Sequence, residues 1–512
     1  MVNFDYKLLL LELLPETVLV IGALIILFLD QASAKRSSVQ ARSTMAAFLG
    51  VLTLLAAIVA VRLQTESSTA VLSVLDLSPF SQIVRVCLCI LGIATLLIAK
   101  PGKFTIHIGE YVALVLFAMI GLLLLAIAEE LLTAFIALEL TSLSLYLLTG
   151  FNKRSRYSAE AALKYFLFGS VAAAFTLFGI SLVFGLSGGT HFQQLAASLR
   201  GQPLSPLMVV ALVLVAIGFA FKMAAAPLHL WAPDAYQGAP VPSAALIASG
   251  SKLASFVLFF KLFSYALPAQ AGSAGFGSST RGWTIIIAAI AGTSIIVGNL
   301  LAISQSNLRR LLAYSAIAHA GYILIAVLAR NELGSASGVY YLFTYGLSVI
   351  GMFGIVGVLE KQHGELSIQE LAGLSRRAPL LAICLFIFVL SLAGIPPLAG
   401  FFGKFYIFIA AVDASRTGGS PGLLWIVILA LAASAVSLYY YLQILKQAFV
   451  LQGEEPALHV PFFSSITLLT LAAAVVFLGC FPEKLNTPLR KALTSGTEIN
   501  LALPPSGIAA PR

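Results

Sequence analysis

The stretch LLTAFIALELTSLSLYLLTG, from Leu131 to Gly150, is apolar and long enough to cross a lipid bilayer as a helix, yet Glu139 lies near its middle. Three other apolar stretches carry a lysine in the same way: Lys222 in VALVLVAIGFAFKMAAAP, Lys252 in PSAALIASGSKLASFVLFF and Lys404 in PPLAGFFGKFYIFIAA. An ionisable group at the bilayer centre costs about 3 kcal/mol or more, so such residues usually face protein or water and carry function. Charges of both signs on separate helices indicate a route for protons or ions through a membrane.

The composition is that of a polytopic membrane protein. Of the 512 residues, 60% are hydrophobic and 10% are charged, whereas a soluble domain carries about 25% charged residues. The net charge of +9 does not require a nucleic-acid partner, because the basic residues lie in short loops where the positive-inside bias accounts for them. We therefore expect the chain to lie in a lipid bilayer and to bind no nucleic acid.

Cofactor-binding motifs are absent from the sequence. The cysteines, Cys87, Cys89, Cys384 and Cys480, lie in apolar segments and form neither a CxxC pair nor a metal-ligand spacing. No GxGxxG or Walker-type loop follows a predicted strand. We expect no metal, iron–sulfur cluster, disulfide or nucleotide in this chain. The first apolar run lacks a basic region and a cleavage site, so it is expected to be a retained helix.

Apolar runs of about 20 residues predict an all-α membrane protein with about fourteen transmembrane helices. The predicted spans are approximately 8–29, 44–63, 79–99, 110–128, 131–150, 160–186, 205–228, 240–267, 283–303, 309–329, 337–359, 379–410, 422–446 and 462–480. They form an N-terminal three-helix segment (1–109), two five-helix units (110–267 and 283–446), and a last span with a C-terminal tail (447–512).

Basic residues are concentrated in alternate loops. The rich loops hold Lys35, Arg36 and Arg42; Lys100 and Lys103; Lys153, Arg154 and Arg156; Arg309 and Arg310; and Lys361, Arg376 and Arg377. The loops between them hold mostly single basic residues: Arg200, Arg281, Arg330 and Arg416. The rich loops should face the cytoplasm, which places both termini on the outer face of the cell (inner or plasma) membrane. The basic tail goes against this bias, but terminal tails are weak determinants.

Proline interrupts two spans: Pro227, with Pro233 close behind it, in the seventh, and Pro396 and Pro397, after Gly394, in the twelfth. Proline frees a carbonyl one turn upstream, which in a membrane must be buried in protein or face water. A plain kink is the alternative, but each break lies within two or three turns of a buried lysine. The sequence therefore predicts that helices seven and twelve are discontinuous.

The two five-helix units carry their features in the same order. The fifth span carries Glu139 and the tenth carries His319, while the seventh and twelfth each carry a lysine and a break. Because corresponding spans are five apart, an odd number, the second unit runs in the opposite direction to the first. This pattern predicts two inverted repeats with relay sites on discontinuous helices near the midplane.

Four segments resemble the antiporter-like membrane subunits of respiratory complex I, an NADH:quinone oxidoreductase. They are ELTSLSLYLLTGFNKRSRYSAEAALKYFLFGS (139–170), FKMAAAPLHLWAPDAYQGAP (221–240), NLRRLLAYSAIAHAGYILIA (307–326) and LAGIPPLAGFFGKFYIF (392–408). The resemblance covers nearly the whole chain. The lysine of GFFGKFY is similar to the N type of the family, also called subunit 2, whereas the M type has glutamate there. The L type has a long C-terminal extension, and this chain ends soon after its fourteenth span.

This resemblance implies a proton-translocating subunit of the membrane arm, part of a translocase but without a redox centre of its own. NADH, FMN, iron–sulfur clusters and quinone would be bound elsewhere in the complex. The implied partners are the antiporter-like subunits M and L and the small subunits K, J and A. The photosynthetic counterpart shares the motifs. An Mrp-type monovalent cation/proton antiporter subunit is the alternative from another class, and a scaffold with an inactive channel would not be expected to retain five costly ionisable groups.

Six residues are candidates for the relay: Glu139, Lys164, Lys222, Lys252, His319 and Lys404. The resemblance implies that Glu139 and Lys222 form a charge pair that sets the proton affinity of Lys222, and that Lys404 is the exit residue. Histidine exchanges protons near neutral pH, although a lone histidine in an apolar helix is often only a hydrogen-bonded core residue. Lys164 is either a relay residue, as in the family, or a surface partner of Glu160 one turn away.

The two lysines of the eighth span are not equivalent. Lys252 and Lys261 are separated by nine residues, or two and a half turns, and so point to opposite faces. We expect Lys252 on the axis and Lys261 to be structural, because it is near the outer end, where a lysine can reach the lipid headgroups. Arg85 could pair with a neighbouring helix, and Asp234 is expected to fix the broken helix; Glu12 and Glu16 have no assigned role.

Overall fold

The computed structural model describes residues 6–35, 37–64, 74–99, 101–363, 366–416, 422–453, 457–458 and 460–502. Within these residues the chain is helical, and only isolated β-bridges form, without strands. The α-helices are α1 (Tyr6–Glu12), α2 (Leu14–Ser33), α3 (Val39–Leu63), α4 (Pro79–Ile98), α5 (Ile108–Ile127), α6 (Leu131–Thr149), α7 (Arg156–Ser187), α8 (Phe192–Ser198), α9 (Pro206–Met223), α10 (Trp231–Gly238), α11 (Val241–Ala248), α12 (Gly250–Phe260), α13 (Trp283–Ile303), α14 (Leu308–Ala329), α15 (Glu332–His363), α16 (Leu374–Arg377), α17 (Pro379–Ala393), α18 (Ala399–Arg416), α19 (Leu424–Phe449), α20 (Phe462–Cys480) and α21 (Glu483–Ala502). The shorter helical turns are η1 (Pro101–Lys103), η3 (Pro268–Gln270), η4 (Ile368–Leu371) and the π-helix η2 (Lys261–Ala266).

Thirteen helical segments of the described residues are long and apolar enough to cross a membrane. Each corresponds to one predicted span, and the remaining predicted span, 379–410, is divided between α17 and α18. Long apolar runs become helices in lipid because only a helix or a closed barrel satisfies every backbone N–H and C=O group without water. The prediction of an all-α membrane protein is confirmed.

The two ends of the chain differ from the prediction. The first span is Leu14–Ser33 and not 8–29, because Leu13 leaves the helical conformation and Pro15 begins a new helix in its first turn, where a missing N–H costs nothing. The chain after α20 is not simply a tail, since Glu483–Ala502 forms α21. Arg36 and Lys100 of the basic loops, and 503–512 of the tail, lie outside the described residues.

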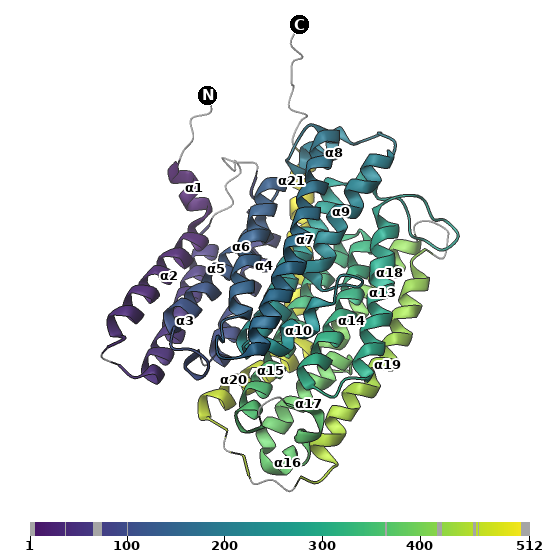
Figure 1. The fold of residues 1–512 in the computed structure, drawn as a ribbon. Helices are drawn as coiled ribbons and strands as arrows, with labels where there is room; N and C mark the ends of the chain where they lie inside the picture. The colour runs from purple at the N-terminus through teal and green to yellow at the C-terminus, as the bar shows by residue number, and fades with distance from the viewer. Residues whose placement is uncertain are drawn as a thin grey trace.

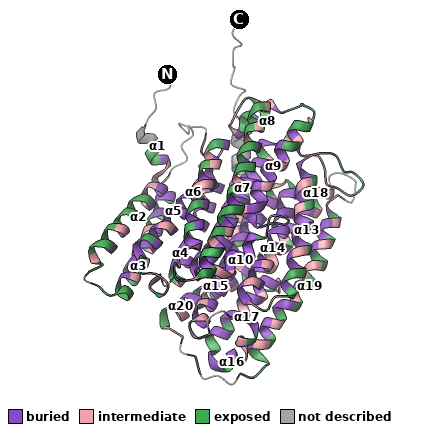
Figure 2. Cartoon of the chain, in the orientation of Figure 1, coloured by how far each residue is buried: buried purple, intermediate pink, exposed green. Residues whose placement is uncertain are grey.

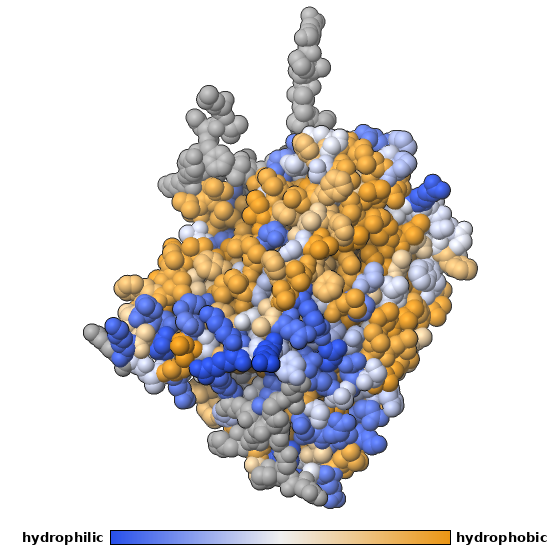
Figure 3. Space-filling view, in the orientation of Figure 1, coloured by the Kyte–Doolittle hydropathy of each residue, from blue (hydrophilic) through white to orange (hydrophobic). Residues whose placement is uncertain are grey.

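The long helices run side by side, from α2 and α3 at one edge to α19 at the other (Figure 1). The segment from α11 to η2 is wholly buried in its most apolar part, and α14 and α15 are nearly so. Exposed residues lie on the outward surfaces of the peripheral helices (Figure 2). Figure 3 shows that hydrophobic residues cover most of this face, while hydrophilic residues gather along its lower edge. The molecule therefore has an apolar surface suited to lipid and a buried centre that can hold polar groups.

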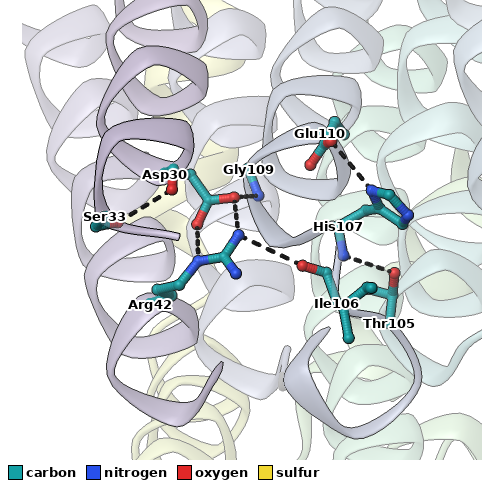
Figure 4. A network of polar contacts seen from close by, with 8 residues as sticks. All are labelled: Asp30, Ser33, Arg42, Thr105, Ile106, His107, Gly109 and Glu110. Carbon is teal, nitrogen blue, oxygen red and sulfur yellow. Dashed lines mark hydrogen bonds and ion pairs between the residues drawn. The ribbon is translucent and has the colours of Figure 1, made fainter. Parts of the chain in front are cut away.

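A polar clamp fastens the N-terminal hairpin to α5 (Figure 4). Arg42 donates to Asp30 from Nε at 2.8 Å and from Nη2 at 2.6 Å. The Asp30 Oδ2 atom, which accepts from Arg42 Nη2, also accepts the backbone N–H of Gly109 at 2.9 Å. A Cβ at Gly109 would lie 2.7 Å from the Asp30 Cβ, so glycine is what allows this approach. The clamp satisfies a buried ion pair and an N–H at the start of a helix together.

Helices α13 and α14 approach each other closely at Gly298, where a Cβ would lie within 3.0 Å of the N, Cα and Cβ atoms of Ala318. Gly298→Ala is therefore expected to lower the free energy of unfolding by about 1–3 kcal/mol through overpacking. Gly292→Ala on the same helix is the matched control, because its nearest neighbour is Leu429 Cδ2 at 3.7 Å. There, alanine should be neutral or stabilise the helix by up to about 1 kcal/mol. Thermal unfolding in detergent measures both variants, and equal losses would exclude the α13–α14 contact as the cause.

Candidate functional site

The seventh predicted span is discontinuous, as expected. Helix α9 ends at Met223, Ala224 adopts the left-handed conformation with φ of 56°, and α10 begins only at Trp231. Two polar side chains of α13 satisfy the backbone freed by the break: Ser294 accepts the N–H of Ala226 at 2.8 Å, and Thr293 donates to its carbonyl at 3.3 Å. Lys222 lies in the last turn of α9, directly before this break.

The twelfth predicted span is broken in a matching way. Helix α17 ends at Ala393, Gly394 is left-handed with φ of 87°, and α18 begins at Ala399. The Lys404 ammonium turns back to the break and donates to the carbonyls of Leu392 at 3.3 Å and Ala393 at 3.0 Å. A cation at a helix C-terminus is favourable because the last carbonyls have no intrahelical partner.

The two breaks share the same spacing. The left-handed residue stands three positions before a cis-proline in both, Ala224 before Pro227 and Gly394 before Pro397. The lysines, however, stand on opposite sides: Lys222 precedes its break and Lys404 follows it. Counted from the proline, the position of Lys404 corresponds to that of Asp234 in the first unit.

A third break interrupts the eighth predicted span, which was expected to be continuous over 240–267. Ser249, with φ of −114° and ψ of −84°, separates α11 from α12. The only sequence signal is the small-residue run at 249–251, and Gly/Ser pairs are a known cause of helix kinks. Lys252 follows the break, is buried, and donates to the carbonyl of Ala316 on α14 at 2.6 Å. Three lysines of the axis are thus each placed beside a helix break.

Glu139 of α6 and Lys222 of α9 line one small cavity between α6, α7 and α9, together with Phe135, Leu138, Ala172, Ala173, Thr176 and Gly218. Lys222 donates to the hydroxyl of Ser142, and its ammonium lies 5.6 Å from the centre of the Tyr146 ring. Glu139 is close enough to act on Lys222 electrostatically, but the two charges form no direct ion pair. The resemblance implies that Glu139 pairs with Lys222, but the group in contact with the Lys222 ammonium is the Ser142 hydroxyl.

His319 lies at the centre of the second group. It is buried on α14, with Nδ1 2.5 Å from the hydroxyl of Tyr341 and Nε2 3.1 Å from that of Tyr441. Lys252 and Lys404 both act on the ring electrostatically. The structure therefore brings Lys252, His319 and Lys404 together around α14, while Glu139 and Lys222 form a separate group around α6 and α9.

Lys164 lies at the edge of the axis, with its side chain 41% exposed. It forms the predicted pair with Glu160 at 2.6 Å and a second pair with Asp234 of α10 at 2.8 Å. Asp234 also pairs with Arg310 at the start of α14, at 2.8 Å. These contacts tie α10, the second half of the broken helix, to α7 and α14, in agreement with the expectation that Asp234 fixes this helix.

Arg85, Glu16 and Lys261, which were given no place in the relay at the sequence level, are held in ion pairs. Arg85 is fully buried and donates to both oxygens of Glu16, at 2.7 and 2.6 Å, and to Gln64 at 2.7 Å. The expectation of a pair with a neighbouring helix is therefore confirmed. Lys261 is buried and not exposed at the outer end, with its ammonium 2.5 Å from Asp76 and 3.2 Å from Glu129, which is a structural role of another kind than reaching the headgroups. These two carboxylates come from the segments just before α4 and α6.

Most buried and half-buried cations in the described part of the chain are of two kinds. Outside the axis, Arg42, Arg85, Lys261 and Arg309 each pair with a carboxylate, while Arg377 donates to the backbone carbonyl of Glu370. Lys222, Lys252 and Lys404 form no ion pair there and contact only hydroxyls, carbonyls and aromatic rings. An ammonium group held by a carboxylate stays charged, whereas one in a low-dielectric site without a counter-charge can exchange its proton.

Sequence patterns alone did not indicate the tyrosines around His319. Tyr341 stands in VYYLFTY on α15, and Tyr441 stands in LYYYL on α19, and both are buried. Each counts as apolar in a hydropathy window although it carries a hydroxyl. Aromatic runs in the middle of a span were the signal that could have identified them. Among the described residues, no group of three or more His, Cys, Asp or Glu side chains has the arrangement of a metal site.

Residues 128–436 match the family described as NADH:quinone oxidoreductase/Mrp antiporter, transmembrane. The chain is 47% identical over 501 residues to NADH-quinone oxidoreductase subunit N 2 of Acidobacterium capsulatum, covering 95% of this chain and 99% of the relative. A chain of respiratory complex I from Thermus thermophilus is 31% identical, with a TM-score of 0.74 over 93% of this chain and 99% of the other. A chain of the Mrp complex from Dietzia sp. DQ12-45-1b shares the fold, with a TM-score of 0.76 at 20% identity over 95% of this chain and 99% of the other.

Proposed function

Because the chain belongs to the NADH:quinone oxidoreductase/Mrp antiporter family of membrane proteins, we propose that it relays protons across the membrane as a membrane-arm subunit of an NADH:quinone oxidoreductase. The observation that carries this proposal is the set of three lysines beside helix breaks, each without a direct ion pair in the described residues. Buried unpaired ammonium groups are costly and are not needed by a passive scaffold. Such groups suit a path on which protons are taken up and released.

The relay runs from Glu139 and Lys222 to Lys252, and from there through His319 to Lys404. A proton on Lys222 is stabilised by the negative charge of Glu139 and by the Ser142 hydroxyl. A change in the charge of Glu139 alters that stabilisation and favours transfer of the proton onward. Lys164 contributes from the edge, where its pair with Asp234 holds the second half of the helix that carries Lys222.

The two five-helix units, 110–267 and 283–446, act as inverted copies, each supplying one half-channel. The matching spacing of the breaks at Ala224 and Gly394 supports this arrangement. The chain would lie in the cell (inner or plasma) membrane with both termini on the outer face. Redox chemistry takes place in other subunits, which bind NADH, FMN, iron–sulfur clusters and quinone, and the neighbours in the membrane are subunits M, L, K, J and A of the complex.

The second candidate is an Mrp-type cation/proton antiporter subunit, favoured by the shared fold of the Dietzia Mrp chain. Purification of the tagged chain from its own membrane in mild detergent separates the two. Partners that carry flavin and iron–sulfur clusters support the redox-driven pump. Recovery of membrane subunits alone, with no redox protein, would replace it with the antiporter.

In the purified complex, Lys222→Ala is expected to lower proton pumping at least about tenfold, because the step after Glu139 loses its proton carrier. Pumping is measured as acidification of sealed vesicles on addition of NADH and quinone. Assembly is checked by NADH oxidation with an artificial acceptor that does not need the membrane arm. Lys153→Ala, at an exposed loop lysine, is the matched control. Normal pumping by Lys222→Ala would mean that the chain is a scaffold.

A further inference from the structure

The two ring nitrogens of His319 are both occupied by tyrosine hydroxyls from different helices. Tyr341 belongs to α15 and Tyr441 to α19, and both side chains are fully buried. A neutral imidazole has one N–H donor and one bare nitrogen. One hydroxyl therefore accepts a hydrogen bond from the ring while the other donates to it, so the ring has a donor on one side and an acceptor on the other.

The hydrogen-bonded chain extends past Tyr441 toward Lys252. The Tyr441 hydroxyl lies 2.5 Å from the hydroxyl of Ser315, and either group can donate. Ser315 precedes Ala316, whose carbonyl accepts the Lys252 ammonium at 2.6 Å. One end of the chain is therefore beside the lysine of the eighth span.

The other end of the chain lies against α18. A Cβ on Gly403 would lie within 3.0 Å of the Tyr341 ring, so this ring packs directly on the residue that precedes Lys404. Ser315, Tyr441, His319 and Tyr341 thus form a hydrogen-bonded series of exchangeable protons that begins next to the carbonyl partner of Lys252 and ends at a ring packed on the residue before Lys404.

We infer that the hydroxyls of Tyr441 and Tyr341 are relay groups that carry the proton into and out of His319. When Lys252 gives a proton to the Ser315 oxygen, the Ser315 proton passes to Tyr441 and the Tyr441 proton to Nε2 of His319. The Nδ1 proton then passes to Tyr341, and the Tyr341 proton goes to Lys404. Each intermediate hydroxyl, and the His319 ring as a whole, gains one proton and loses one, so Lys252 ends neutral, Lys404, which begins as a neutral amine, ends protonated, and no group between them remains charged. Rotation of the hydroxyls and tautomer exchange of the ring restore the chain.

This inference rests on the proposed relay from Lys252 to Lys404, and it explains how a proton can pass from one lysine to the other through a histidine without placing a second full charge between them. Like charges close together in a low-dielectric site repel strongly. A neutral chain that passes on one proton while another arrives avoids this repulsion.

A third tyrosine provides the control. The Tyr345 ring also packs on His319, with 4.8 Å between ring centres. Its hydroxyl is buried but has no hydrogen-bond partner in the described part of the chain. Tyr345→Phe therefore removes the same atom from the same surroundings without interrupting the chain of hydrogen bonds.

The experiment measures proton pumping and NADH:quinone electron transfer of the intact complex in sealed vesicles, for Tyr341→Phe, Tyr441→Phe and Tyr345→Phe. Loss of a positioned proton-transfer group typically costs about 100-fold or more, so pumping is expected to fall on that scale in the first two variants. Tyr345→Phe should retain the wild-type rate. Tyr441→Phe and Tyr341→Phe combined should be no worse than either alone, because one interruption already breaks the series.

Two readouts distinguish a relay from a positioning role. The deuterium solvent isotope effect on pumping should rise in Tyr441→Phe if proton transfer through His319 has become rate-limiting. Substitution of Tyr441 by fluorotyrosine, which keeps the hydroxyl but changes its acidity, should change the rate if the hydroxyl carries the proton and leave it unchanged if the hydroxyl only orients the ring.

Wild-type pumping in both single Phe variants overturns the inference. If a Lys252 variant also pumps normally, the proposed relay itself fails; if it does not, only the tyrosine step is excluded.

Discussion

Replacement of Lys261 by methionine is expected to lower the free energy of unfolding by about 3–5 kcal/mol, the usual cost of removing one partner of a buried ion pair. Lys261 is 2% exposed and donates to Asp76, Ser81 and the carbonyl of Ala126. The substitution would leave the Asp76 and Glu129 carboxylates close together without a cation. Thermal unfolding of the detergent-solubilised protein measures the loss, and Lys446→Met, at an exposed lysine of α19, should change it by no more than about 0.5 kcal/mol.

Lowering the pH should show whether Lys261→Met destabilises the protein through the lost charge or through a packing defect. Burial raises the pKa of Asp76, but the Lys261 ammonium outweighs burial and the pKa is lowered overall. The stability that Asp76 contributes is therefore present at neutral pH and is lost as the pH falls through this lowered pKa. Burial raises the pKa of Glu129, which Lys261 only partly offsets. Without Lys261 both carboxylates should bind protons more readily, so Lys261→Met is expected to recover stability relative to wild type as the pH is lowered from 7 toward about 5. A deficit that does not change with pH would show that charge is not the cause.

The membrane fold could be predicted from the sequence because hydropathy over about 20 residues reports directly on the cost of burying backbone and side chains in lipid. The prolines predicted the breaks in the seventh and twelfth predicted spans, which lie between α9 and α10 and between α17 and α18. The reason is similar, since proline removes a hydrogen bond that nothing else in a helix replaces. The break at Ser249 has no proline, so it was not predicted, although the span that contains it was. The error for the first span came from Pro15, which a hydropathy average does not register.

The candidate site was predictable residue by residue, but its contacts were not. Lys261 appeared suited to the headgroup region because its partner Asp76 is 185 residues away in the sequence and stands in a short connecting segment. Conversely, the resemblance implied a charge pair of Lys222 with Glu139, and the structure adds a contact that it did not imply, the Ser142 hydroxyl on the ammonium. Counting charged residues identifies which groups are costly to bury; only the packing shows which of them have a counter-charge.

Lys252→Met is expected to abolish pumping, with a fall of about 100-fold or more, while the protein becomes more stable. Lys252 stands on the same helix as Lys261 and is equally buried, but among the described residues it forms no ion pair and has one carbonyl partner, Ala316. Methionine has nearly the same shape and removes an ammonium group that costs roughly 2–3 kcal/mol to bury. The gain in the free energy of unfolding should approach that value, opposite in sign to the effect at Lys261.

The two lysines therefore form a matched pair in which the same substitution separates function from structure. Pumping in sealed vesicles and thermal unfolding of the same preparations give two numbers for each variant, with Lys446→Met as the shared control. A stable Lys252→Met protein that still pumps would remove Lys252 from the relay. A destabilised one would mean that Lys252 has a structural partner, and the loss of pumping would then carry no information about proton transfer. A proton carrier without a counter-charge requires lost pumping together with raised stability. Its buried ammonium group lowers the free energy of unfolding, and the fold keeps it because proton transfer needs it.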